Sequence, residues 1–232
     1  QYIKNLSKDS KVILNKNDAN SERIILGYKG EVSYFEGGDW DLNVPGTFNQ
    51  LNAEAAWKAA EALGVDKGVA EKALKKYNGA WRRMELIEPI KGYEGAIFYS
   101  DYGHHPTEIL VTTKAIKDKY RDKELLLVYQ PHQVKRLEAL FDDFVSAFRN
   151  VGELVLLPVY EVAGREGQKG KTSKDLAQAI GEQNKKSGVK QKVHYLQSFE
   201  EALKLVGEQV VVFMGAGDID KEVRKYFKSK LL

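Results

Sequence analysis

Apolar residues in the second part of the chain follow two alternating spacings. Runs of consecutive apolar residues predict buried strands at residues 96–99, 125–129, 154–157, 193–196 and 210–213. Between these runs apolar residues recur at helical spacing, most clearly over residues 134–148, and Pro106 stands where a helix tolerates proline best, at its start. Strands that alternate with helices indicate a parallel sheet covered on both faces.

The first part of the chain shows a more mixed pattern. β-prone runs at residues 11–14 and 23–28 are separated by a turn-rich segment, and residues 31–35 followed by 40–44 suggest a hairpin. Two helices are then predicted. One runs from Asn49 to Leu63, and a shorter one covers residues 66–77.

The 232 residues suffice for two modest domains, each with a buried core. We assign residues 89–232 to a doubly wound α/β domain with a mostly parallel sheet, and residues 1–88 to part of a mixed α/β domain. The chain begins at Gln1 without an initiator methionine, so we expect a piece of a longer protein.

Composition narrows the classes of function. Hydrophobic residues make up 43% and charged residues 30%, as in ordinary soluble globular proteins, and no apolar run approaches the ~18–20 residues of a membrane span. A formal net charge of +3 gives no basis for nucleic-acid binding. The absence of cysteine excludes disulfides and thiolate metal ligands, and it is typical of a reducing compartment.

Polar clusters follow three of the predicted strands. They lie at residues 101–105, 130–132 and 215–218. In doubly wound sheets ligands bind outside the carboxyl ends of the strands. We therefore expect these clusters to converge on one binding site.

Two glycine-containing segments are weak phosphate motifs. Residues 164–172 lie between a strand and a helix, but five residues separate Gly164 from Gly170 where the Walker pattern has four between its glycines, and Arg165 stands where the first glycine is needed. A basic loop leading to a helix capped near Thr172 or Ser173 is the better interpretation. Residues 215–217 lack the third glycine of a dinucleotide fingerprint.

The paired histidines His104 and His105 are poor candidates for a shared metal ion. Adjacent residues of an extended loop direct their side chains apart. His194 lies within a predicted strand, where a structural role is expected. No serine occupies a Gly-x-Ser-x-Gly elbow, so a hydrolase triad is not supported, and we expect no metal site in this chain.

Four short motifs occur in a defined order. They are Asn-Gln-Leu-Asn at 49–52, Trp-Arg-Arg-Met-Glu at 81–85, Asp-Tyr-Gly-His-His-Pro-Thr-Glu at 101–108, and Tyr-Gln-Pro-His at 129–132 followed by Leu-Phe-Asp-Asp-Phe at 140–144. In this order they resemble the Mur ligases, and the third motif is diagnostic of the alanine-adding branch. The resemblance implies that residues 1–88 end a central ATP-binding domain and that residues 89–232 form a Rossmann-like C-terminal domain.

The resemblance also implies an activity. ATP would phosphorylate the carboxylate of UDP-N-acetylmuramate, and the amine of L-alanine would attack the acyl phosphate, in cytoplasmic synthesis of peptidoglycan precursors. ATP and Mg²⁺ are the implied cofactors. The phosphate loop, the Mg²⁺ ligands and the catalytic histidine of the central domain are not found in this sequence, so this chain alone is expected to be inactive.

By the same resemblance, four residues would serve the nucleotide. Asn49 and Asn52 would hydrogen-bond it from the start of their helix. Arg83 would face the ATP phosphates as a catalytic cation, because a planar guanidinium suits phosphate oxygens. Asp101 would contact the nucleotide from the C-terminal domain, by way of the ribose.

Four residues would line the amino-acid end of the site: Tyr102, His104, His132 and Arg136. Arg136 is the candidate for the alanine carboxylate. A histidine there, His104 first, would help deprotonate the attacking ammonium group, since its pKa lies near neutral.

Ordinary structural roles remain alternatives for single residues: Asn49 as a helix cap, Arg83 as a surface arginine, Asp101 as a turn residue. The chain departs from the family pattern at Phe48, Ser100 and Gln133, where histidine, an acidic residue and arginine are usual. Two other functions stay open, a sibling ligase that recycles a tripeptide and a nucleotide-binding module without catalysis.

Overall fold

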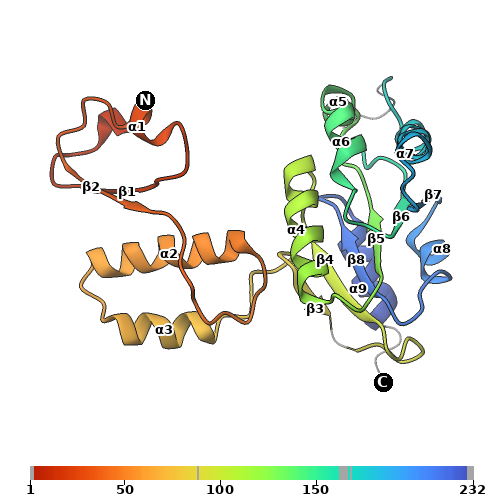
Figure 1. Cartoon of the computed structure of the whole chain (residues 1–232), viewed down its shortest axis with the longest axis horizontal. Coiled ribbons are helices and arrows are strands. Elements are labelled where there is room, and N and C mark those ends of the chain that lie inside the picture. Colours follow the sequence, from red (N-terminus) through yellow and green to blue (C-terminus); the bar gives the residue numbers. More distant parts are fainter. Residues whose placement is uncertain (1–2, 88, 162–166, 168, 229–232) are drawn as a thin grey trace. The chain divides into compact units, whose positions relative to one another are not determined.

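The computed structural model describes residues 3–87, 89–161, 167 and 169–228. It divides into two compact units, Gln1–Asn78 and Gly79–Leu232, and each is described by itself (Figure 1). The division falls before the boundary expected after residue 88, because the strand at Glu85–Ile87 joins the sheet of the second unit. Part of the glycine-containing segment 164–172 lies outside the described residues.

The first unit consists of a two-stranded parallel sheet and the helices around it. Its elements are η1 (Ile3–Asn5), β1 (Lys11–Asn15), α1 (Ser21–Ile24), β2 (Glu31–Phe35), α2 (Thr47–Ala62) and α3 (Lys67–Lys75). β1 pairs with β2 in parallel, with Val12 opposite Val32. α2 packs against both strands and buries Ala53 and Trp57.

Two predictions for this unit were wrong. β2 pairs with β1 and forms no hairpin with residues 40–44, since the Gln50 side chain bonds the backbone N–H and C=O of Trp40 in place of a strand. Residues 23–28 form the end of α1 and a turn instead of a strand. Their apolar run is not buried, because Leu26 is 85% exposed.

The second unit is a six-stranded sheet with helices on both faces. Its strands are β3 (Glu85–Ile87), β4 (Ile97–Asp101), β5 (Leu125–Tyr129), β6 (Glu153–Leu156), β7 (Lys192–Tyr195) and β8 (Val210–Met214). Its helices are α4 (Pro106–Lys119), α5 (Val134–Ala139), α6 (Phe141–Ala147), α7 (Ser173–Ser187), α8 (Phe199–Leu203) and α9 (Ile219–Lys228). The strand order is β3-β4-β8-β5-β6-β7, and β3 alone among these strands is antiparallel to its neighbour. The predicted doubly wound, mostly parallel α/β fold is confirmed.

Alternate residues of the central strands supply two cores. Leu126 and Val128 of β5 belong to a cluster that includes Phe199 of α8 and Phe227 of α9. On the opposite face, Tyr129 packs against Phe144 and Phe148. β5 is buried along its whole length, as a strand between helical layers must be.

Helix boundaries follow from local chemistry. His105 is the N-cap of α4, where its side chain accepts the N–H of Thr107, and Pro106 takes the first helical position. Thr172 caps α7 with a reciprocal bond to Asp175, as expected from the sequence. The helix predicted over residues 134–148 is interrupted at Leu140, and its buried face is retained on both pieces. None of the helices in the ranges described above is long and apolar enough to cross a membrane.

Candidate functional site

The carboxyl ends of three adjacent strands bring the predicted polar loops together. β8 lies between β4 and β5, and both Asp101 and Tyr129 are in register with Met214. The loops that begin at residues 102, 130 and 215 therefore leave the sheet side by side, as expected. No side chain fits at Gly215, since a Cβ there would lie 2.7 Å from the backbone oxygen of Gln130. Packing therefore accounts for a glycine at this position.

Asp101 is a buried carboxylate at the end of β4 that connects two segments by hydrogen bonds. Its side chain accepts the backbone N–H of Gly103 at 2.7 Å and that of Met84 at 2.8 Å, so it joins its own loop to the segment before β3. The residue is 4% exposed. Burial raises the pKa of Asp101, and the two N–H donors partly oppose that rise. The nucleotide contact predicted for this carboxylate stays a prediction.

Arg83 projects from a turn with an unusual backbone. Its neighbours Arg82 and Met84 have φ values of 54° and 47°, in the left-handed region that non-glycine residues seldom occupy. Asp101 and Tyr102 hold this turn, because Met84 N–H donates to the Asp101 carboxylate and Tyr102 N–H donates to the carbonyl of Arg82 at 2.7 Å. Backbone strain of this kind concentrates at functional sites.

The two arginines of this turn have opposite surroundings. The Arg82 side chain is buried and donates to the carbonyl of Gly215. The Arg83 side chain is 53% exposed, lies over the Tyr102 ring, and approaches Glu108 at 3.5 Å. Arg83 is thus the arginine whose guanidinium is accessible to a ligand.

The histidines form a row of rings beside this turn. The His104 ring lies 5.3 Å from that of Tyr102 and 6.1 Å from that of His132, measured between centroids. His132 stacks on Tyr160 at an interplanar angle of 13°, and Arg136 lies 3.5 Å from its Nδ1. The four residues predicted for the amino-acid end are therefore brought together.

The contacts of the two rings bear on the charge of His132 and on the tautomer of His104. Burial, followed by the positive charge of Arg136 and then by His104, lowers the pKa of His132 and favours its neutral form. The Nδ1 atom of His104 lies 3.1 Å from the carbonyl of Tyr102. In the tautomer that donates this bond, Nε2 is left as a free proton acceptor.

Asn49 and Asn52 line a cavity of the first unit. This cavity, of about 400 Å³, lies between α2, α3 and the segment before α2, and its other lining residues are Leu42, Val44, Ala53, Ala56, Ala73, Leu74 and Tyr77. Asn49 is inside α2, whose N-cap is Gly46, so it does not cap the helix. Its Nδ2 donates to the carbonyl of Pro45 at 2.7 Å, which fixes the amide.

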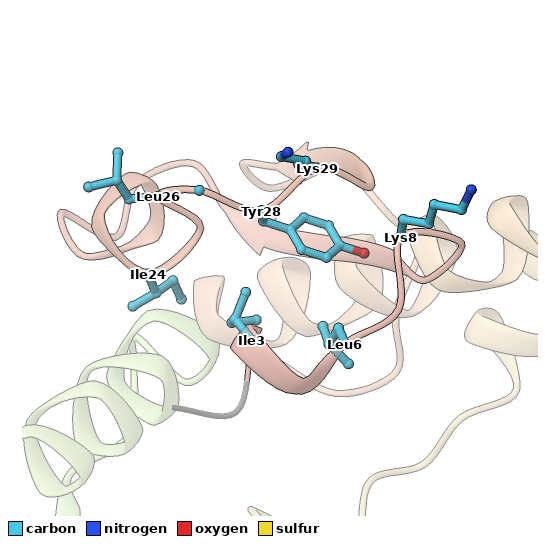
Figure 2. Close-up of a pocket in the computed structure, with 8 residues that line it drawn as sticks. Ile3, Leu6, Lys8, Ile24, Leu26, Tyr28 and Lys29 are labelled. Atoms are coloured by element: carbon cyan, nitrogen blue, oxygen red, sulfur yellow. The ribbon is translucent and has the colours of Figure 1, made fainter.

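A second cavity of the first unit, of about 420 Å³, contains none of the predicted residues. Figure 2 shows its lining side chains, Ile3, Leu6, Lys8, Ile24, Leu26, Tyr28 and Lys29. The Tyr28 hydroxyl already donates to the carbonyl of Ser10. Across the described part of the chain no three His, Asp or Glu side chains converge as metal ligands.

Three residues of the second-unit site were not assigned a role from the sequence. Arg82 anchors the turn; Glu108 accepts the N–H groups of His104 and His105 at 2.9 and 3.0 Å; and Tyr160 supports His132. For Glu108 a signal was present, since an acidic residue three positions after an N-cap is typical of a capping box. Arg82 and Tyr160 depend on contacts between distant segments, which no local pattern indicates.

Comparison with known proteins identifies the class. A family profile described as Mur ligase, glutamate ligase domain, matches residues 82–217, which include this entire second-unit site. The chain belongs to the Mur ligase family.

Among curated proteins, the chain is 36% identical over 193 residues to a UDP-N-acetylmuramate–L-alanine ligase of Hydrogenobaculum sp. (strain Y04AAS1), covering 82% of this chain and 40% of that protein. It is also 36% identical over 189 residues to the ligase of the same name from Aquifex aeolicus (strain VF5), covering 81% and 39%. The chain thus spans about 40% of the length of these relatives.

Solved structures share the fold. The UDP-N-acetylmuramate–alanine ligase of Thermotoga maritima superposes with a TM-score of 0.62 at 23% identity, covering 88% of this chain and 42% of that one. A MurF structure from Acinetobacter baumannii gives a TM-score of 0.67 at 19% identity, covering 97% and 53%. At such identities the likeness establishes the fold alone.

Proposed function

We propose that this chain is the amino-acid-binding and nucleotide-contacting part of an ATP-dependent ligase that joins L-alanine to UDP-N-acetylmuramate in the cytoplasm. The observation that carries the proposal is the convergence of Arg83, Tyr102, His104, His132 and Arg136 at the carboxyl ends of β4 and β5. The identity of 36% to alanine-adding relatives supports the choice of amine.

In this proposal Arg83 stabilises charge on the phosphoryl group. Phosphoryl transfer depends on positioning and on cations placed where charge develops. The Arg83 guanidinium lies over the Tyr102 ring near Glu108, so it is oriented while it stays exposed to a ligand. Its fork can bind two phosphate oxygens at once.

Asn49 and Asn52 would bind the adenine of ATP. The cavity beside them is lined mainly by apolar side chains, which suits the faces of a purine, and an asparagine amide can pair with adenine N6 and N7. The Asn49 side chain keeps its carbonyl oxygen available, since its bond to Pro45 uses Nδ2.

The row of rings would receive L-alanine. Arg136 provides a cation for the substrate carboxylate, and a neutral imidazole accepts the proton that the ammonium group must lose before it attacks the acyl phosphate. His104 is our candidate base, because Nε2 is the free acceptor when Nδ1 bonds Tyr102. ATP supplies the activating phosphoryl group. No step is assigned to Mg²⁺, whose ligands we expect in a preceding part of the polypeptide.

The test is ligation by the parent protein that carries this chain. We expect ADP release to require both UDP-N-acetylmuramate and L-alanine, and Arg83→Ala to lower kcat/KM for ATP about 100-fold. Arg121→Ala, which removes an exposed arginine in the loop after α4, is the matched control and should leave it unchanged. A preference for tripeptide over alanine would establish the recycling ligase instead, and binding of ATP without any ligation would establish a nucleotide-binding module.

A further inference from the structure

A buried ionic network lies behind the turn that presents Arg83. Asp220 of α9 is 4% exposed and accepts a hydrogen bond from the Ser100 hydroxyl at 2.6 Å. Arg224, one turn later on α9, donates Nε to both Asp220 oxygens at 3.0 Å. A carboxylate this deeply buried needs such partners, because burial without them is costly.

The network reaches the turn by two routes. The first is direct: Arg82 Nε lies 3.8 Å from Asp220 Oδ2 and has no hydrogen bond of its own in the described structure, so Asp220 provides its nearest compensating charge. The second passes through Arg224, whose Nη2 donates to Glu85 at 2.6 Å. The same Glu85 oxygen accepts the backbone N–H of Arg82 at 2.8 Å.

These routes act on the backbone on both sides of Arg83. Arg82 and Met84 hold left-handed φ values that relax unless the surroundings fix them. Arg82 is fixed by Glu85, Gly215 and the Asp220 charge, and Met84 is fixed by Asp101. Among the described residues, the Arg83 side chain contacts Glu108 and Tyr102, and neither belongs to this network.

We propose that Asp220 is a positioning residue that holds the Arg82–Met84 backbone, directly and through Arg224 and Glu85, in the conformation that directs Arg83 towards the ATP phosphates. The inference rests on the proposed function of Arg83. It extends that function to α9, a helix to which the proposed function assigns no substrate contact.

The test is a double-mutant cycle in the parent ligase. Asp220→Asn should raise KM for ATP and lower kcat/KM for ATP about tenfold, while KM for L-alanine stays unchanged. In an Arg83→Ala background the same substitution should change kcat/KM for ATP less than about twofold, since it acts through a side chain already removed. Lys221→Gln, the exposed next residue of α9, is the control and should have no effect in either background.

A second variant keeps the proposal testable if Asp220→Asn fails to fold. Removing one member of a buried ion pair can prevent folding. Arg224→Gln removes the bonds to Glu85 and Asp220 but leaves Asp220 beside Arg82, and it is measured beside Asp220→Asn, with a urea transition to show that each variant folds. It should give a smaller rise in KM for ATP, again absent in the Arg83→Ala background.

Two outcomes overturn the inference. One is an equal loss from Asp220→Asn or Arg224→Gln with and without Arg83. The other is a lower kcat with KM for ATP unchanged, as expected when a variant only reduces the folded fraction. Failure of the proposed function is recognised separately, because the unsubstituted parent protein would then show no alanine-dependent release of ADP.

Discussion

At the scale of single residues, the adjacent arginines illustrate what a sequence can and cannot specify. The family resemblance of the Trp-Arg-Arg-Met-Glu motif predicts a guanidinium for phosphate, which stays a prediction, and the structure shows that the second arginine is the accessible one. Arg82 is buried against Gly215 and Asp220, residues more than 130 positions away in the chain. A contact at that separation leaves no local periodicity, so the anchoring role of Arg82 is visible only in the folded chain.

His132 provides a prediction at this scale. In the 232-residue chain, an NMR titration of its ring proton should give a pKa below the ordinary histidine value, and Arg136→Gln should raise that pKa because it removes a nearby positive charge. Since the folded pKa lies below the unfolded one, the unfolded state binds the proton more readily. The contribution of neutral His132 to stability is therefore lost as pH falls from the pKa of the unfolded state through the pKa of the folded state.

Arg149→Gln removes an exposed arginine on the same domain and serves as the control. A His132 midpoint that does not move with Arg136→Gln would show that Arg136 does not act on this ring.

At the scale of helices and strands, prediction succeeded where burial is continuous. Residues 125–129 were predicted as a strand and are β5, since a run of buried apolar residues in a parallel sheet has few other interpretations. The first unit is different. Its β-prone run at residues 23–28 is largely exposed, and the apolar character of a segment indicates a strand only when a sheet buries it.

The N-cap of α7 makes a contribution to the free energy of unfolding that is simple to test. Thr172→Ala removes the hydroxyl that accepts the Asp175 N–H, and it should lower the free energy of unfolding by about 1 kcal/mol in urea. Thr172→Ser keeps the hydroxyl and should cost much less. Equal losses for the two substitutions would mean that the methyl group, not the cap, matters at this position.

At the scale of the whole molecule, the two units differ in how much core they contain. The buried hydrophobic residues described in the first unit are Val12, Leu14, Val44, Ala53, Trp57 and Ala70. The second unit has helical layers on both faces of a six-stranded sheet. We expect the second unit to provide most of the stability.

This difference predicts that residues 79–232 fold alone. Expressed without the first unit, they should unfold cooperatively in urea with a free energy of roughly 5–15 kcal/mol and give a dispersed amide NMR spectrum. Residues 1–78, prepared in the same way, should show a weaker and broader transition. A collapsed spectrum for residues 79–232 would mean that their core needs the first unit to form.

The position of β8 has a consequence for biosynthesis. This strand is near the end of the sequence, yet it lies at the centre of the sheet, between β4 and β5. Until residues 210–214 leave the ribosome, the edge of β4 and the edge of β5 that will pair with β8 have no partner. Pairings between segments this distant in sequence form slowly and expose unpaired edges meanwhile. The nascent chain therefore depends most on chaperones until β8 has been made, and a nonsense mutation just before residue 210 should be as damaging as one far upstream.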